Sequence, residues 1–256
     1  MMFRLHTIIL RLLFSLTIVM LSCLITGLNK PRNKPAENGF VVLELFTAEG
    51  CSSCPPADES MIQLAKEYPK NVYILGFHVD YWNYIGWTDS FSNEAFSARQ
   101  KSYADKLNTG AVYTPQVIID GKKQMVGSNK SDLISVIRTE LDKNTNTEMS
   151  LSANKENDER IQVKYTTKGD KASVLNIALV QLEAVTNVKR GENKNRLLHH
   201  INIVRELKTI SAKRNIEGTV AFEIPQGLTI RDIEFIAFLQ NKNNWQVTGA
   251  TSTSVQ

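Results

Sequence analysis

Two of the three cysteines in the 256-residue chain, Cys51 and Cys54, are three residues apart. An apolar, β-branched run at 41–46 comes before them, and two prolines and an amphipathic stretch follow at 55–68. A strand that leads into a two-cysteine turn at the start of a helix is typical of a thiol–disulfide redox site. The unpaired N–H groups and the positive dipole end of a helix N-terminus favour a thiolate over a thiol. The pair therefore indicates redox chemistry at sulfur.

The spacing also predicts a separate role for each cysteine. Cys51 comes first, at the exposed entrance to the helix, so we expect it to be the nucleophile. Cys54 lies one turn further in, and we expect it to act as the resolving thiol that closes a Cys51–Cys54 disulfide. No dissociable cofactor is implied, because the sulfur atoms carry the electrons.

Two other uses of the pair have to be weighed. A zinc site needs about four ligands. The remaining candidates are His78, His199, His200 and carboxylates, with no second CxxC pair, so we predict no metal. A permanently oxidised structural bridge stays open as an alternative, although so short a loop constrains little of the unfolded chain.

The first 37 residues read as a signal or membrane anchor with a polar spacer. Arg4 and Arg11 precede an apolar run at 12–28, and a polar, proline-containing stretch follows. A charged start and an apolar middle are typical of an export signal or signal-anchor, and 17 residues is at the short limit for crossing a bilayer. Since no clean cleavage site follows, an uncleaved anchor is favoured over a cleaved signal.

Cys23 adds a third possibility, because residues 20–23 form a loose bacterial lipoprotein box. Lipidation at Cys23 and a plain apolar role in the helix both stay open. The CxxC pair favours the oxidising, extracytoplasmic side, the bacterial periplasm or envelope. The membrane is an expected partner through 12–28. Nucleic acid is not, because the net charge is only +4 and no long basic block occurs.

Helical and strand patterns alternate over residues 38–145. The predicted order is strand 39–46, helix 55–68, strand 72–79, helix 93–107, strand 116–120, a hairpin turn at 120–121 into 124–126, and helix 133–141. A sheet with helices packed on it is an α/β domain.

From residue 146 to 256 strand-like alternation replaces helical periodicity. The predicted strands are 161–165, 175–182, 199–207, 218–224, 232–239 and 245–253. Turn residues separate them, which predicts a second, smaller all-β, sandwich-like domain.

The motif Tyr113-Thr114-Pro115 directly precedes the third strand. Proline cannot donate a hydrogen bond to a sheet, so a special local geometry is implied. The order of elements, the CxxC-Pro turn and this Thr-Pro pair resemble the thioredoxin superfamily. The resemblance implies a cis bond before Pro115, a position beside the redox pair, and contact of Thr114 with substrate backbone. Trp82, in an aromatic loop at 80–89, is expected either to cap the core or to belong to a recognition surface.

Longer motifs resemble the bacterial secreted "domain of unknown function 1223" family over nearly the whole chain after the spacer. They are residues 46–58 (FTAEGCSSCPPAD), 78–82 (HVDYW), 86–87 (GW), 113–116 (YTPQ) and 126–128 (VGS). This resemblance implies a thioredoxin-like domain, with a second β-rich domain, and it implies no substrate.

The chain departs from thioredoxin around the cysteines. Leu45 stands where that family often has a buried acid that accepts the proton of the resolving thiol. Glu44 is next to it, but strand alternation points its side chain to the opposite face, and we expect Glu49 to be exposed. Gly50 replaces the usual aromatic residue before the first cysteine. Proton handling is therefore left unassigned by the sequence.

The sequence thus predicts an exported thiol–disulfide oxidoreductase that acts on protein or small thiols. Its expected partners are protein thiols or disulfides, or an electron-donor redox protein. The alternative is a non-enzymatic envelope binding module with a structural disulfide. A peroxidase is disfavoured, because Thr47 lies four residues before Cys51, whereas peroxiredoxins have a Thr-x-x-Cys spacing.

Overall fold

The computed structural model describes residues 39–145, 147–168, 172–211 and 215–256. The apolar run at 12–28 and Cys23, for which we expect export, anchoring or lipidation, lie outside the described residues. Among the helices that the structure describes, none combines the length and the apolar character needed to cross a membrane.

Every element predicted before residue 145 is present. The elements are β1 (Val41–Thr47), α2 (Pro55–Glu67), β2 (Val72–His78), the 3₁₀ helix η1 (Asp80–Ile85), α3 (Glu94–Lys106), β3 (Gln116–Ile119), β4 (Lys123–Val126) and α4 (Lys130–Leu141). Asp120 and Gly121 have positive φ angles of 48° and 66°, as a tight hairpin turn requires. Helix α4 starts earlier than predicted, because the side chain of Asn129 caps it.

The second half of the chain is made of strands. They are β5 (Glu148–Lys155), β6 (Arg160–Lys168), β7 (Ser173–Asn187), β8 (Leu197–Ser211), β9 (Asn215–Glu223), β10 (Ile233–Asn241) and β11 (Val247–Ser254). The sequence pattern predicted all of these except β5. It underestimated β7 and β8, which have 15 residues each and pair with each other as a long antiparallel hairpin.

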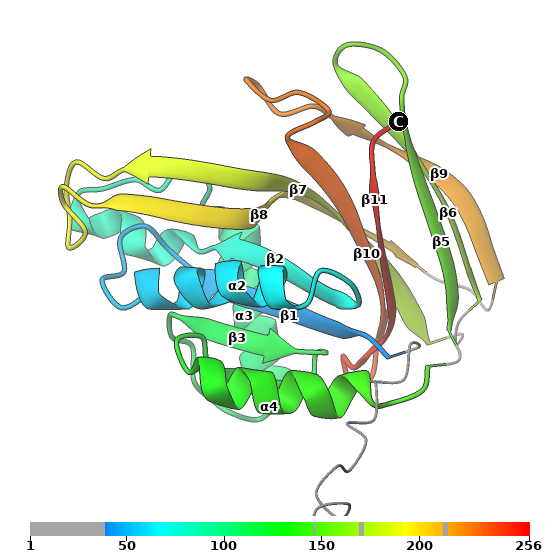
Figure 1. Cartoon of the computed structure of the whole chain (residues 1–256), viewed down its shortest axis with the longest axis horizontal. Coiled ribbons are helices and arrows are strands. Elements are labelled where there is room, and N and C mark those ends of the chain that lie inside the picture. The colour runs from blue at the N-terminus through cyan, green and yellow to red at the C-terminus, as the bar shows by residue number, and fades with distance from the viewer. Residues whose placement is uncertain (1–38, 146, 169–171, 212–214) are drawn as a thin grey trace, which may run out of the picture. The chain divides into compact units, whose positions relative to one another are not determined.

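The predicted fold class is wrong in how these strands are arranged. Strands β7, β8, β10 and β11 do not form a sandwich of their own but continue the first sheet, in the order β11-β10-β7-β8-β2-β1-β3-β4 (Figure 1). The join is a parallel contact between β2 and β8 at Gly76 and Ile203. The protein is therefore mostly β and built on one mixed eight-stranded sheet, rather than an α/β thioredoxin-like domain followed by a smaller all-β domain.

Three buried clusters hold this sheet. Helices α2 and α4 cover one face of β1 and β3, with Leu45, Met61 and Ile137 at the contact. On the opposite face, β1, β2 and α3 share a core with β7 and β10, and both cysteines belong to it. The three-stranded sheet β5-β6-β9 packs on the outer face of β7 and β10.

A buried ion pair connects these parts. Arg99 on α3 donates two hydrogen bonds to Glu44 on β1, at 2.6 and 2.9 Å, and the carboxylate also accepts from the Tyr103 hydroxyl. The guanidinium stacks over the ring of Trp245 at 5.7 Å and contacts Gln240 on β10. As expected from strand alternation, Glu44 points to the α3 side, away from α2.

We predict that Arg99→Met lowers the free energy of unfolding by about 3–5 kcal/mol, because it leaves the Glu44 carboxylate, 1% exposed, as an unpaired buried charge. The matched control is Arg138→Met, whose ion pair with Glu67 is on the surface and should matter little. Urea unfolding of both variants measures the difference, and equal losses would contradict the role of the pair.

Candidate functional site

Cys51 and Cys54 form the predicted disulfide. The pair closes a turn directly before α2, in which the N–H groups of Ala57 and Asp58 bond to the Cys54 carbonyl at 2.8 and 3.2 Å. The expectation that Cys51 is exposed is wrong. Cys51 is 0% exposed and Cys54 1% exposed, while Ser52 between them lies at the surface.

The second half of the chain places a clamp of two residues, Asn193 and Glu192, on the turn. Asn193, in the connection between β7 and β8, donates from Nδ2 to the carbonyl oxygens of Glu49 and Cys51, at 2.8 and 2.9 Å. The carboxylate of Glu192 accepts from the Ser52 N–H at 3.2 Å. Figure 1 shows this connection at the same end of the sheet as the start of α2.

The other predicted site residues also lie at the turn. The Thr114–Pro115 bond is cis, as the resemblance implied, and Ser53 Oγ lies 3.4 Å from the Thr114 carbonyl. Trp82 of η1 donates from Nε1 to the Thr114 hydroxyl at 2.8 Å. The structure thus brings Cys51, Cys54, Thr114, Pro115 and Trp82 into one region.

Glu49 is a site residue that the sequence pattern misplaced. We expect it to be exposed, but it is fully buried. One carboxylate oxygen accepts from Trp87 Nε1 at 2.7 Å, and its backbone N–H donates to Asp89 at 2.9 Å. A carboxylate therefore lies two residues before the cysteine pair, on the inside of the protein.

Asp89 links Glu49 to a buried histidine. His78 is 1% exposed, and its Nδ1 lies 2.7 Å from Asp89 Oδ2. Burial by itself lowers the pKa of His78, but the Asp89 carboxylate, helped by Asp58 and Glu49, outweighs burial and raises it. Burial raises the pKa of Asp89, but His78 and the hydrogen bonds from backbone N–H groups outweigh it and lower that pKa.

Asn193, Glu192 and His200 are site residues that sequence reasoning did not find. Asn193 lies 142 residues from Cys51, in a polar stretch that reads as an ordinary loop. Of the neighbouring residues His199 and His200, His200 is buried and His199 is exposed. No local signal indicated that its strand passes beside the cysteines.

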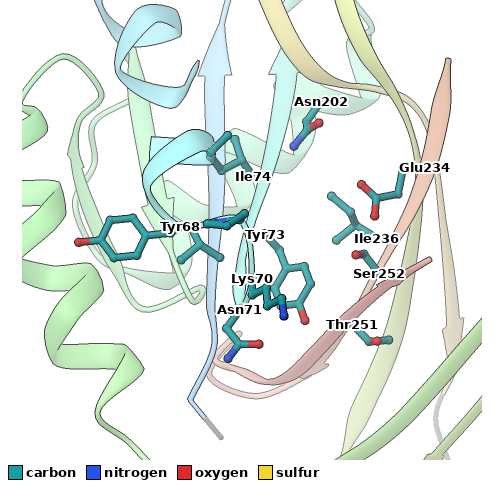
Figure 2. Close-up of a pocket in the computed structure, with 13 residues that line it drawn as sticks. Tyr68, Lys70, Asn71, Tyr73, Ile74, Asn202, Glu234, Ile236, Thr251 and Ser252 are labelled. Atoms are coloured by element: carbon teal, nitrogen blue, oxygen red, sulfur yellow. The ribbon is translucent and has the colours of Figure 1, made fainter. Parts of the chain in front are cut away.

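A separate hollow of about 320 Å³ lies between the start of β2 and strands β10 and β11. Figure 2 shows Tyr73, Glu234 and Ser252 at its edge. Burial, and to a lesser extent the Glu234 carboxylate, raise the pKa of Tyr73, so the phenol stays protonated more readily than an exposed tyrosine. Cysteine is not among the described residues that line the hollow, and we therefore place the candidate site at the disulfide.

The fold and the site define a class of protein: one large mixed sheet that buries a CxxC disulfide at the start of a helix. The chain belongs to the family described as "protein of unknown function (DUF1223)", whose model matches residues 42–240. The resemblance to this family is thereby confirmed. Membership of the thioredoxin superfamily is not shown.

Among solved structures, the chain is similar to a protein from Agrobacterium tumefaciens determined by X-ray crystallography. The identity is 26% and the TM-score 0.66, over 86% of this chain and 96% of the other. A domain of the outer membrane lipoprotein Omp28 from Porphyromonas gingivalis matches at 14% identity, over 44% of this chain and 89% of that domain. Its TM-score of 0.28 carries no argument. No curated protein matches the chain.

We predict that Asn193→Ala loosens the clamp. It removes the donor for two carbonyl oxygens at the cysteine turn, so the free energy of unfolding should fall by about 1–3 kcal/mol and dithiothreitol should reduce the native disulfide faster. Lys194→Ala, at an exposed neighbouring position of the same connection, is the control. A reduction rate equal to that of Lys194→Ala would show that the clamp does not limit access.

The His78–Asp89 pair predicts a pH dependence of stability. Because the native pKa of His78 is raised above 6.5, protonated His78 contributes stability that is fully present below pH 6.5. That contribution is lost as the pH rises through the native pKa. His78→Gln should therefore be most destabilising near pH 5–6 and less so towards pH 9, as measured by urea unfolding. The exposed His199→Gln should follow the wild type, and a loss for His78→Gln that is independent of pH would contradict the assignment.

Proposed function

We propose that the protein is an exported thiol–disulfide oxidoreductase whose redox pair is Cys51 and Cys54. The observation that carries the proposal is the disulfide at the N-terminus of α2, where helix N–H groups and the helix dipole favour a cysteine thiolate. The proximity of Thr114, Pro115 and Trp82 to the same turn supports it.

In the oxidising direction, a substrate thiolate attacks Cys51 Sγ, and the electron pair of the S–S bond leaves with Cys54. A mixed disulfide forms between the substrate and Cys51. A second substrate thiolate then attacks the substrate sulfur of that bond, which releases Cys51 as a thiolate and the substrate as a disulfide. Of the two protons that the substrate dithiol loses, Cys54 takes one and solvent takes the other. In the reducing direction the same steps run backwards.

Ser53 is placed to assist the Cys51 thiolate. Its Oγ lies 3.3 Å from Cys51 Sγ, so its hydroxyl can donate a hydrogen bond to the sulfur once negative charge develops there. Donation to the charged form lowers the pKa of a thiol.

A substrate thiol reaches Cys51 only when the covering groups separate. The covering groups are Asn193 and Glu192 of the β7–β8 connection, and the hydrogen-bonded pair Trp82 and Thr114. In this proposal Trp82 and Thr114 move aside and, with Pro115, hold the backbone of the incoming chain. The partners are protein thiols or disulfides, or a redox protein that supplies electrons.

Location is part of the proposal. A CxxC pair that works as an oxidant belongs in an oxidising, extracytoplasmic compartment, and the apolar run at 12–28 provides export and membrane attachment. No dissociable cofactor takes part, because both electrons reside on sulfur.

The burial of both cysteines favours a second candidate function, a non-enzymatic envelope binding module in which the disulfide is fixed. Its clamp would then serve stability, and the β-rich half would bind the partner.

A redox titration of the full-length protein against dithiothreitol and glutathione separates the two functions. An oxidoreductase should show a reversible two-electron midpoint near −120 to −270 mV, whereas a fixed bridge should resist reduction below about −300 mV. Cys54→Ser should retain a mixed disulfide with glutathione at Cys51, and Cys51→Ser should not. Cys23→Ser, which removes the third cysteine, is the control and should leave the midpoint unchanged.

A further inference from the structure

His200 is a buried side chain without a hydrogen-bond partner. It lies on β8, is 2% exposed, and is located between two carboxylates. Its Nδ1 is 3.5 Å from Asp58 Oδ2 and its Nε2 is 3.7 Å from Glu49 Oε1. Within the described part of the chain, both nitrogens and Glu49 Oε1 have no hydrogen bond. Buried polar atoms without partners are rare in native proteins and indicate a role other than packing.

Few other ionisable groups surround this imidazole. The His78 ring meets it edge to face, with the ring centroids 4.8 Å apart, and His78 is paired with Asp89. The centroid of the Phe91 ring lies 6.1 Å from that of the His200 ring. The guanidinium of Arg205 stacks on Phe91, 5.2 Å from the ring centroid. His200 is thus directly faced by Glu49, Asp58 and His78.

Both carboxylates that face His200 are connected to the redox turn. Asp58 follows Cys54 by one helical turn, and its N–H bonds to the Cys54 carbonyl at 3.2 Å, so the two side chains share a helix face. Glu49 precedes Cys51 by two residues, and its carbonyl accepts from the same Asn193 amide as the Cys51 carbonyl. The imidazole therefore contacts the chain on either side of the disulfide.

This arrangement is suited to a proton rather than to a metal. Among the described residues, no group of three or more histidine, cysteine, aspartate or glutamate side chains is placed to hold a metal ion. Histidine is the side chain that changes charge between pH 5 and 8, and a position between two carboxylates allows it to pass a proton to either one.

We propose that His200, acting through Asp58, supplies the proton that Cys54 takes up when the disulfide is reduced. The proposal rests on the proposed function. When a dithiol attacks Cys51, Cys54 leaves as a thiolate at a position that is 1% exposed, where a charge is costly. The proton passes from His200 to Asp58 to Cys54, and solvent restores it to His200 when the turn opens. His200 is therefore a positioning residue, since it does not touch the sulfur.

The experiment is the pH profile of reduction of the full-length oxidised protein by dithiothreitol, with each rate constant divided by the thiolate fraction of the reagent. For the wild type the corrected constant should fall as the pH rises from 5 to 9, as general acid catalysis requires. His200→Gln should be about 100-fold slower at the acidic end, which is the lower range of general acid catalysis, and its profile should be flat. Asp58→Asn should behave like His200→Gln.

His199→Gln is the matched control, because His199 is the exposed neighbour on the same strand and its replacement should leave the profile unchanged. A second measurement needs no variant: the corrected rate of the wild type should be lower in D₂O than in H₂O. The pH profile and the D₂O effect both report on proton transfer and not on stability, so a purely structural role of His200 would not produce them.

If His200→Gln and Asp58→Asn keep the wild-type profile while dithiothreitol still reduces the disulfide, the proton proposal is overturned and the proposed function stands. An equal corrected rate in D₂O and H₂O would overturn it as well. If dithiothreitol does not reduce the native wild-type protein at any pH, both the proton proposal and the oxidoreductase function fail.

Discussion

The contact between β2 and β8 is the constraint on which the rest of the structure depends. The strands pair at Gly76 and Ile203, and a Cβ at position 76 would lie only 3.3 Å from the carbonyl oxygen of Ile201. The absence of a side chain at Gly76 therefore permits the close approach of two backbones. From this join the sheet continues into the second half of the chain, β8 passes beside α2, and His200 arrives opposite Asp58.

The length of the β7–β8 hairpin determines what happens at the cysteines. Fifteen residues in each strand carry the connection between them as far as the redox turn, where Asn193 bonds to the Glu49 and Cys51 carbonyls. A tight turn before a helix leaves backbone carbonyls that need donors, and a distant asparagine provides them. The disulfide at this turn is buried, so the proposed function requires that the region opens before a thiol attacks.

Two sets of buried ionisable side chains differ in whether they form hydrogen bonds. Glu44 accepts two hydrogen bonds from Arg99 and one from Tyr103, which makes it a satisfied part of the core. His200 and one oxygen of Glu49 are equally buried but have no hydrogen bond within the described residues. Because a buried polar group without a hydrogen bond costs free energy, stability alone does not explain the second set.

The sequence by itself determined the local elements and the oxidised pair. Period-two alternation and helical spacing identified β1 to β4, the helices and six of the seven later strands, because these patterns report which face of each element is buried. The CxxC turn and Thr114-Pro115 identified the site, because their chemistry is local. Only the tertiary structure decided that the later strands join the first sheet, that Cys51 is buried, that Asn193 bonds to its turn, and that His200 lies beside Glu49 and Asp58. Strand pairing joins residues more than a hundred positions apart. Because one edge strand offers the same N–H and C=O groups as another, the sequence pattern does not indicate which strands pair.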